Sequence, residues 1–267
     1  MKRIFLCICL LSTLFSCGEK TNNPGGNGGD DPDKPVNPPV EIPEPPKDIV
    51  QANLFTVDFF STLDEASFFI THDENTIKSH IKAQQAPKPL FYFIDRCDYV
   101  TGEENKMTAV GKDLKYNAFF AQIEATDAVK TNGTGILTIY KPKRYDGIAE
   151  EGCFMSGVCF KAPLSTAVEL TVYTTKLTDI EQFYTIIKKR SAALYEESVV
   201  VGTIAGSIKE QVKKYANDNL GLRMEYSGSD KAYDVFVLCN PGYVCRSISE
   251  GKRDDCPYYR IAIERLN

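Results

Sequence analysis

Ser198-Val199-Val200-Val201-Gly202 and, shortly after it, Ser207-Ile208-Lys209-Glu210 carry the clearest structural signal in this sequence. The first segment is a continuous apolar run that ends in glycine, which is typical of a strand buried on both faces. In the second segment, Ser207 is an N-cap residue and Glu210 completes a capping box for a helix that runs to about Asn217. A buried strand followed directly by a capped helix predicts an α/β domain.

The surrounding sequence extends this order in both directions. Thr178 is expected to cap a helix that runs to about Tyr195, with Asp179 and Glu181 in its first turn. A further amphipathic helix is expected over Asn75–Ala83. Short β-rich runs predict strands over Asn53–Phe60, Pro89–Asp95, Lys115–Ile123, Gly135–Tyr140, Gly157–Lys161, Ala167–Thr174, Tyr233–Cys239 and Tyr258–Leu266. Many strands and few helices favour stacked sheets with outer helices over one doubly wound sheet.

Five segments stand out in chain order, namely Thr134–Pro142, Val172–Leu177, Val199–Ala205, Ala232–Val237 and Asp254–Pro257. Together they resemble motifs of the endonuclease/exonuclease/phosphatase superfamily, which has the DNase I-like fold. Thr134–Pro142 is similar to its "GNAILSKYP" strand, and Val172–Leu177 lies where the family has a strand ending in "NTHL". Val199–Ala205 is similar to "VVVGDFN", Ala232–Val237 to "IDYIFV", and Asp254–Pro257 to "SDHxP". The resemblance covers most of Asp48–Asn267. It implies an α/β domain built as a four-layer α-β-β-α sandwich, with two packed mixed sheets and outer helices.

The resemblance also implies a chemistry. Members of the family hydrolyse phosphodiesters or phosphomonoesters with a divalent metal that Glu, Asp and Asn side chains hold, and two histidines polarise the phosphate and orient the attacking water. Oxygen ligands suit Mg²⁺, and imidazole carries a proton near neutral pH.

Carried over residue by residue, most of that site is missing. Lys176 replaces the "THL" histidine, and Thr203 and Ala205 replace the Asp and Asn of "GDFN". Cys256 replaces the "SDH" histidine, although Asp255 before it is kept. No residue is therefore assigned a catalytic role.

The first two strands of the family site are also altered. The family's glutamate falls near Asp95 or Arg96, and its first-strand asparagine falls near Phe60, with Asp58 on the same side. The only two histidines, His72 and His80, are interpreted as surface residues on a loop and a helix. A site built on two histidines cannot be assembled from this sequence.

Several carboxylates remain near the expected ends of the sheets. Asp95, Asp254 and Asp255 are candidate ligands for weak binding of Mg²⁺ or Ca²⁺, and no other cofactor is expected. The favoured interpretation is that Asp98, Asp254 and Asp255 are solvated loop charges. Lys176 is either a fixed positive charge that faces an anion or an ordinary surface lysine.

Nine cysteines divide into two groups. Cys7, Cys9 and Cys17 lie near the N-terminus, and six remain in the domain. An even number in an exported domain favours disulfides, and a zinc site lacks a CxxC motif and a nearby histidine. Two local pairs are candidates, and the resemblance places the third pair at the floor of the family's active site; the three pairs are Cys153–Cys159, Cys239–Cys245 and Cys97–Cys256.

The N-terminus predicts export and a lipid anchor. Lys2 and Arg3 precede the apolar run Ile4–Phe15, which is too short to span a bilayer, and Ser16-Cys17 resembles a bacterial lipobox. Residues 1–16 are therefore expected to be a signal peptide, and residues 17–47 a lipidated cysteine with a disordered stalk rich in Pro, Gly and Asp. Residues 48–267 are expected to form a single domain. Gly18 at the second mature position favours the outer membrane.

The favoured function is that of a membrane-anchored, extracytoplasmic lipoprotein whose domain binds a glycan, peptide or protein without catalysis. The net charge is −5 and no basic stripe is visible, so no nucleic-acid partner is expected. Tyrosines are candidates for the binding surface, namely Tyr145, Tyr226, Tyr243, Tyr258 and Tyr259. A metal-dependent phosphoesterase with a rebuilt acidic site is the alternative, and a β-sandwich adhesin is the third reading.

Overall fold

The computed structural model describes residues 53–64, 68–84, 88–100, 102–125, 130–150, 153–161, 169–195, 197–253 and 255–266. All of them belong to one compact unit, Pro43–Asn267. The expected signal peptide, Cys17 and the stalk lie outside the described residues, as do Asp254 and the side chain of Asp98.

Six strands form the first sheet, in the order β11-β12-β1-β2-β4-β3. β1 pairs in parallel with β2, and the other neighbours are antiparallel, so the sheet is mixed. Its strands are β1 (Leu54–Phe60), β2 (Phe91–Val100), β3 (Asn117–Ala125), β4 (Lys130–Thr138), β11 (Tyr243–Arg253) and β12 (Cys256–Arg265).

Six further strands form the second sheet, in the order β5-β6-β7-β8-β10-β9. β7 and β8 run in parallel at its centre, and the other neighbours are antiparallel. Its strands are β5 (Pro142–Glu150), β6 (Cys153–Lys161), β7 (Glu169–Leu177), β8 (Ser198–Ala205), β9 (Arg223–Tyr226) and β10 (Tyr233–Cys239). Seven of the eight residues of β8 are buried, as its apolar run predicts.

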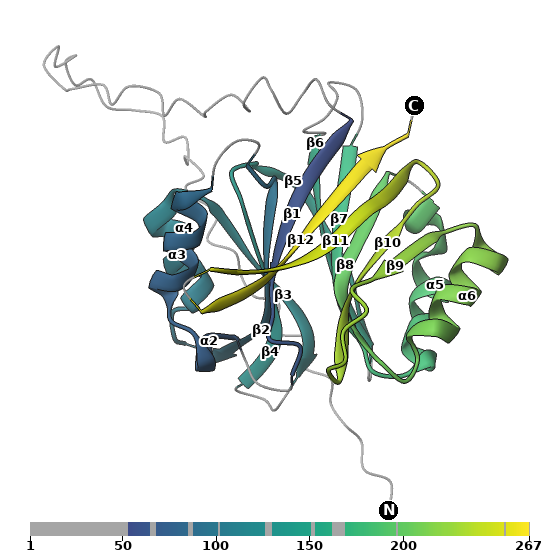
Figure 1. The fold of residues 1–267 in the computed structure, drawn as a ribbon, viewed down its shortest axis with the longest axis horizontal. Helices are drawn as coiled ribbons and strands as arrows, with labels where there is room; N and C mark the ends of the chain where they lie inside the picture. The colour runs from purple at the N-terminus through teal and green to yellow at the C-terminus, as the bar shows by residue number, and fades with distance from the viewer. Residues whose placement is uncertain are drawn as a thin grey trace, which may run out of the picture. The chain divides into compact units, whose positions relative to one another are not determined.

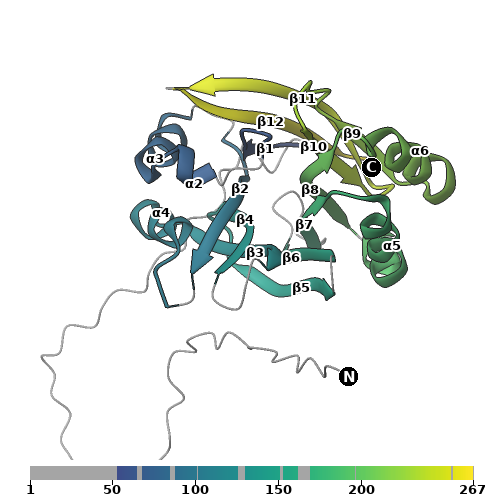
Figure 2. The same cartoon turned by 90° about the horizontal axis from the view of Figure 1, so that it is seen from below.

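Helices cover the outer face of each sheet, as Figures 1 and 2 show. The first sheet is covered by α2 (Phe68–Thr71), α3 (Glu74–Ala83) and α4 (Lys106–Leu114), and the second by α5 (Ile180–Tyr195) and α6 (Lys209–Leu220). The four-layer α-β-β-α sandwich expected from the sequence is therefore confirmed. No helix among the described residues is long and apolar enough to cross a bilayer.

Three apolar clusters hold the layers together. One fills the space between the sheets and includes Phe59, Phe93 and Val201. A second lies between the second sheet and its helices, where Phe183 of α5 and Val212 of α6 are buried. The third lies under α2, α3 and α4. This layering leaves the inner faces of both sheets apolar along most of their length.

The N-termini of α5 and α6 differ from those expected from the sequence. α6 begins at Lys209, and its N-cap position is Ile208, which makes no side-chain cap, so the capping box expected from Ser207 is wrong. Glu210 instead accepts a hydrogen bond from the hydroxyl of Tyr226. At α5, the carboxylate of Asp179 accepts a hydrogen bond from the backbone N–H of Gln182 at 3.0 Å, so Asp179 replaces Thr178 as the cap.

The described cysteines form no disulfide in this structure. The pair Cys153–Cys159 is wrong, because both residues lie in the single extended strand β6. Six residues of strand span about 20 Å, far beyond the reach of a disulfide. Cys239 and Cys245 lie close to one another, and Cys97 and Cys256 are buried in the same cluster. These two pairings stay predictions.

Candidate functional site

Polar side chains gather between the two sheets, at the end where β1, β7 and β8 finish. Both inner faces are apolar elsewhere, so this group stands out. We call it the inter-sheet polar cluster; its members, all less than a tenth exposed, are Ser61, Asp95, Arg96, Thr134, Thr174, Lys176, Thr203 and Tyr233.

A β-bulge brings two neighbouring charges into this cluster. The pairing of β2 with β4 shifts between Ile94 and Cys97, so Asp95 and Arg96 form an irregular step in the strand. Arg96 has a φ of 52°, in the left-handed region that a side chain other than glycine rarely adopts. The bulge lets Asp95 and Arg96 both take part in the buried cluster, while Ile94 and Cys97 pack under the outer helices.

Asp95 is held by its neighbours on the first sheet. Its Oδ2 accepts a hydrogen bond of 2.8 Å from the hydroxyl of Ser61 and lies 3.7 Å from Nε of Arg96. Burial raises the pKa of Asp95 above its ordinary value, and the charges of Arg96 and Lys176 and the Ser61 hydrogen bond oppose that rise. The carboxyl is thus a desolvated group inside a largely cationic setting.

Tyr233, the first residue of β10, stacks against both cations of the cluster. The guanidinium carbon of Arg96 lies 4.7 Å from the centre of its ring, and Nζ of Lys176 lies 5.2 Å from the same centre. A tyrosine ring attracts a cation placed over its face, more strongly when both are desolvated. One aromatic ring therefore joins a charge from each sheet.

Four buried oxygens of the cluster have no hydrogen-bond partner among the described residues. They are Oδ1 of Asp95 and the hydroxyl oxygens of Thr134, Thr174 and Thr203. Most buried polar atoms in proteins are hydrogen-bonded. These oxygens are buried acceptors that the described part of the chain leaves unpaired.

The donor set does not fit a divalent metal. Mg²⁺ and Ca²⁺ bind to carboxylate-rich groups of oxygens, whereas this cluster has one carboxylate, Asp95, beside two cations, Arg96 and Lys176. No group of three or more His, Cys, Asp or Glu side chains in the described part of the chain is arranged to hold a metal. The local charge opposes the binding of a further cation.

Four of the expected site residues come together. Lys176 of β7 and Thr203 of β8 are register partners, and Ala205 of β8 is the partner of Tyr233. Lys176 is only 8 % exposed, so it is not a surface lysine. Asp95 lies in the same cluster, and its pKa responds to the charge of Lys176.

Asp255 and Cys256 lie outside the cluster: Asp255 is a solvated charge, as its favoured interpretation expects, whereas Cys256 is not at the position that the resemblance implies. The side chain of Asp255 is 92 % exposed and forms an ion pair of 2.7 Å with Lys252. Cys256 is buried in the cluster under α2, α3 and α4, on the outer face of the first sheet. Alternate residues of a strand face opposite sides, and β12 turns Cys256 outward and Tyr259 inward.

The first strand also departs from expectation. Phe60 packs under the outer helices, and Ser61, one residue later, reaches Asp95. Asp58 lies on the outer face as well, where it is fully buried and accepts hydrogen bonds from His80 and Arg260. His80 is 1 % exposed, so its interpretation as a surface residue is wrong.

Arg96 as a bulged cation and Tyr233 were missed as functional residues by sequence reasoning. Tyr233 occupies the position of the aspartate in the segment compared with "IDYIFV", and that substitution was the available signal. No periodicity marks Arg96, because a bulge breaks the alternation on which strand prediction depends.

Comparisons with known proteins match this structure in fold. No family model and no curated protein sequence matches the chain. Solved structures are similar to it, and three of them match over about four fifths of this chain and nearly all of the other. An endonuclease/exonuclease/phosphatase family protein from Leptotrichia buccalis has a TM-score of 0.54, 10% identity and coverage of 80% and 100%.

The other two structures have comparable scores. A humanized TDP2 from D. rerio has a TM-score of 0.53, 12% identity and coverage of 80% and 100%. The 3' phosphatase NExo from Neisseria, bound to product DNA hairpin, has a TM-score of 0.52, 9% identity and coverage of 79% and 99%. Identities this low establish the architecture and leave the chemistry open. The domain therefore has the DNase I-like fold of the endonuclease/exonuclease/phosphatase superfamily.

Proposed function

We propose that this domain is a non-catalytic, ligand-binding or partner-binding member of the fold, carried outside the cytoplasm on a lipid-anchored stalk. The observation that carries the proposal is the pair of cations over Tyr233. Arg96 and Lys176 occupy the end of the inter-sheet space with one carboxylate between the sheets. The residues that the resemblance associates with metal-dependent hydrolysis are replaced by a neutral ring, hydroxyls and positive charge.

Electrostatics supports this interpretation. A divalent metal adds two positive charges, and beside two buried cations the Coulomb cost is large because the local dielectric constant is low. The one carboxylate, Asp95, already interacts with Ser61 and Arg96. Neither histidine reaches the cluster: His80 binds Asp58 on the outer face, and His72 stacks on Phe68 of α2. The cluster therefore lacks the histidine that most often acts as a general acid or base.

The N-terminal sequence supports a place in the cell envelope. The run Ile4–Phe15 followed by Ser16-Cys17 is typical of a lipoprotein signal, and the stalk after it suits display of a domain away from a membrane. Incorporation of a labelled fatty acid in the native bacterium tests the anchor. Labelling of the intact chain that disappears in Cys17→Ser supports it, and equal labelling of both overturns it.

The alternative is a metal-dependent phosphoesterase with a rebuilt acidic site. Its one structural support is Oδ1 of Asp95, which is buried and has no hydrogen-bond partner in the described ranges. Such an enzyme needs a second carboxylate near Asp95. Asp255 is exposed and paired with Lys252, and so does not provide one in this conformation.

An activity assay separates the two readings. Purified protein is incubated with bis-p-nitrophenyl phosphate and with p-nitrophenyl phosphate, in the presence of Mg²⁺ or Mn²⁺ and, separately, of EDTA. We expect no metal-dependent turnover from a sample whose circular dichroism shows a folded chain. Metal-dependent turnover that is lost in Asp95→Ala, and kept in the exposed control Asp113→Ala, would overturn the non-catalytic reading.

A further inference from the structure

A pocket of about 280 Å³ lies between the turn that joins β9 to β10 and the β11–β12 hairpin. The turn contributes Asp230 and Lys231, and the hairpin contributes Ile248, Glu250 and Tyr259. The pocket is separate from the inter-sheet polar cluster, whose residues do not line it. Its volume suits the end of a side chain or another small group.

The turn that forms one wall is held rigidly. Asp234, which is fully buried, accepts hydrogen bonds from the hydroxyl of Ser227 at 3.0 Å and from the backbone N–H of Ser229. Its other oxygen accepts from Nζ of Lys209 on α6 at 2.7 Å. A wall fixed in this way loses little conformational entropy when a ligand binds.

Tyr259 supplies a hydroxyl group to the pocket. Its side chain is 3 % exposed, and its hydroxyl makes no hydrogen bond with a residue of the described ranges. Burial raises the pKa of Tyr259 to about 12, and the negative charges of Glu250, Asp234 and Asp230 add to that rise. The pocket thus places the hydroxyl of Tyr259 beside the carboxylates of Asp230 and Glu250.

Lys231 is the one cation among the residues that line the pocket, so one of its two carboxylates, Asp230 and Glu250, stays unbalanced. Neither Asp230 nor Glu250 forms an ion pair with a described residue. Lys231 directs its ammonium group to the backbone oxygen of Thr62 at 2.9 Å. A positively charged ligand would therefore meet two available carboxylates.

We propose that this pocket binds the guanidinium or ammonium group of an arginine or lysine side chain on a protein partner. Asp230 and Glu250 attract the charge, the hydroxyl of Tyr259 accepts a hydrogen bond, and Ile248 packs against the aliphatic stem. The inference deepens the proposed binding function and rests on it.

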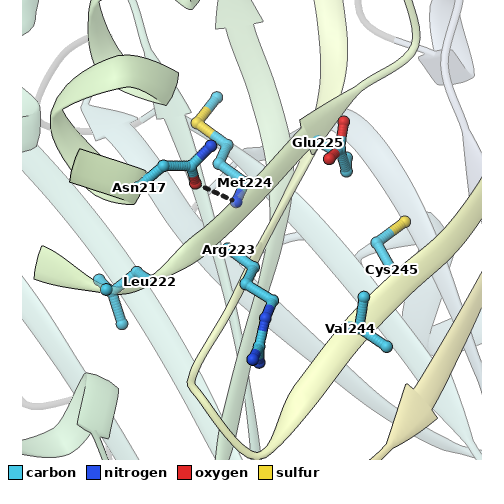
Figure 3. A pocket seen from close by; sticks show the side chains of 8 residues that line it. Asn217, Leu222, Arg223, Met224, Glu225, Val244 and Cys245 are labelled. Atoms are coloured by element: carbon cyan, nitrogen blue, oxygen red, sulfur yellow. Dashed lines mark hydrogen bonds between the residues drawn. The ribbon is translucent and has the colours of Figure 1, made fainter.

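A second pocket of about 290 Å³ provides the contrast. Figure 3 shows Arg223 of β9 and Val244 and Cys245 of β11 around it. The guanidinium of Arg223 donates to the backbone oxygen of Tyr243 at 3.1 Å and to that of Pro241. The two charged residues of this pocket, Arg223 and Glu225, balance one another, whereas Asp230, Glu250 and Lys231 leave the first pocket with a net charge of −1.

The test is a calorimetric titration of the purified full-length chain with Nα-acetyl-arginine amide. Nα-acetyl-citrulline amide, which has nearly the same shape without the charge, is the control ligand. We expect saturable binding of the arginine probe, no measurable binding of the citrulline probe, and weaker binding at high salt because exposed charges are screened.

Variants assign the site. Glu250→Gln is expected to weaken binding about fivefold at low salt, and Tyr259→Phe about three- to tenfold through loss of one hydrogen bond. The matched control is Glu225→Gln, an exposed glutamate at the second pocket, which should leave binding unchanged. Glu250 is exposed and Tyr259→Phe keeps the ring, so both variants should fold, and thermal unfolding checks this.

Equal binding of the two probes, or binding unaffected by Glu250→Gln, would overturn the inference. Failure of the arginine probe to bind overturns it too, but leaves the non-catalytic function standing. Metal-dependent phosphoesterase activity overturns the proposed function through a separate assay. The two failures are therefore distinguishable.

Discussion

The guanidinium of Arg96 lies over the ring of Tyr233, 4.7 Å from its centre, and this contact joins the two sheets at the end where a site is expected. Arg96 belongs to β2 of the first sheet, and Tyr233 begins β10 of the second. Lys176 lies over the same ring at 5.2 Å. Cations buried between two sheets need partners nearby, because water is excluded there. The ring of Tyr233 and the carboxylate of Asp95 are such partners for Arg96 and Lys176.

Replacement of Tyr233 by leucine tests this role. Tyr233→Leu keeps an apolar side chain but removes two desolvated cation–π contacts, so we expect the free energy of unfolding to fall by about 2–4 kcal/mol. Tyr226→Leu is the matched control, because Lys209 and Lys213 lie 4.9 and 5.2 Å from its ring centre at a more exposed position. That variant should lose about 1 kcal/mol. Urea denaturation measures both, and equal losses would contradict the importance of burial.

The pH dependence of stability tests the environment of Asp95. Burial raises its pKa in the folded chain, so the folded state binds this proton more tightly than the unfolded state does. The contribution of Asp95 to stability is therefore fully present below the ordinary pKa and is lost as the pH rises through the raised value. Asp95→Asn removes this dependence. The unfolding free energies of the two proteins should diverge as the pH rises across the acidic range. The native chain should lose stability relative to Asp95→Asn.

Asp255 provides the opposite sign as a control. The hydrogen bond from Lys252 lowers the pKa of Asp255, so its contribution is present above the ordinary pKa and is lost as the pH falls through the lowered value. Asp255→Asn should therefore flatten the acid side of the profile, and only slightly, because this pair is exposed. If the pH dependence of the unfolding free energy changed with the same sign in both variants, the effect of Asp95→Asn would not come from the burial of Asp95.

The fold was predictable where burial imposes a pattern. Val199–Val201 is buried on both faces, so its sequence is a continuous apolar run. Edge strands give a weaker signal: β11 (Tyr243–Arg253) alternates between half-buried and exposed positions and contains several charges, and no strand was expected there. β5 begins with Pro142 at the edge of the second sheet and was missed for the same reason.

The candidate site was predictable only in part. Lys176 and Thr203 were found because motif positions fixed their strands, and the parallel pairing of β7 with β8 makes them neighbours. Cys256 was placed at the site, but the alternation of β12 turns it outward. Partners from distant segments leave no local pattern, which is why burial of His80 against Asp58 was not anticipated.

The buried network around Asp58 yields a stability prediction. Asp58 is fully buried and accepts hydrogen bonds from Nε2 of His80 at 2.9 Å and from Nε and Nη2 of Arg260 at 2.8 and 2.9 Å. Asp58→Asn leaves Arg260 without its counter-ion, so we expect a loss of about 3 kcal/mol. Asp113→Asn is the control, because the ion pair of Asp113 with Lys78 is exposed and should contribute little. Similar losses in the two variants would contradict the prediction.

One mass-spectrometry experiment tests the three cysteine pairings. Protein secreted into an oxidising compartment is alkylated, digested without reduction and analysed by mass spectrometry. We expect linked peptides for Cys97–Cys256, because both side chains are buried in the same cluster under α2, α3 and α4. Such a bond closes a long loop and is worth about 4–5 kcal/mol in the chain-entropy model.

The other two cysteine pairs are internal controls for that experiment. A Cys153–Cys159 link should be absent, because the two residues lie six positions apart along the extended strand β6. Cys239 and Cys245 are neighbours, but burial raises the pKa of Cys239 strongly and that of Cys245 to about 12. Few thiolates form at neutral pH, so this link should appear slowly and faster at alkaline pH. A Cys153–Cys159 link in folded protein would contradict the register of β6, and unlinked Cys97 and Cys256 would refute the pairing implied by the resemblance.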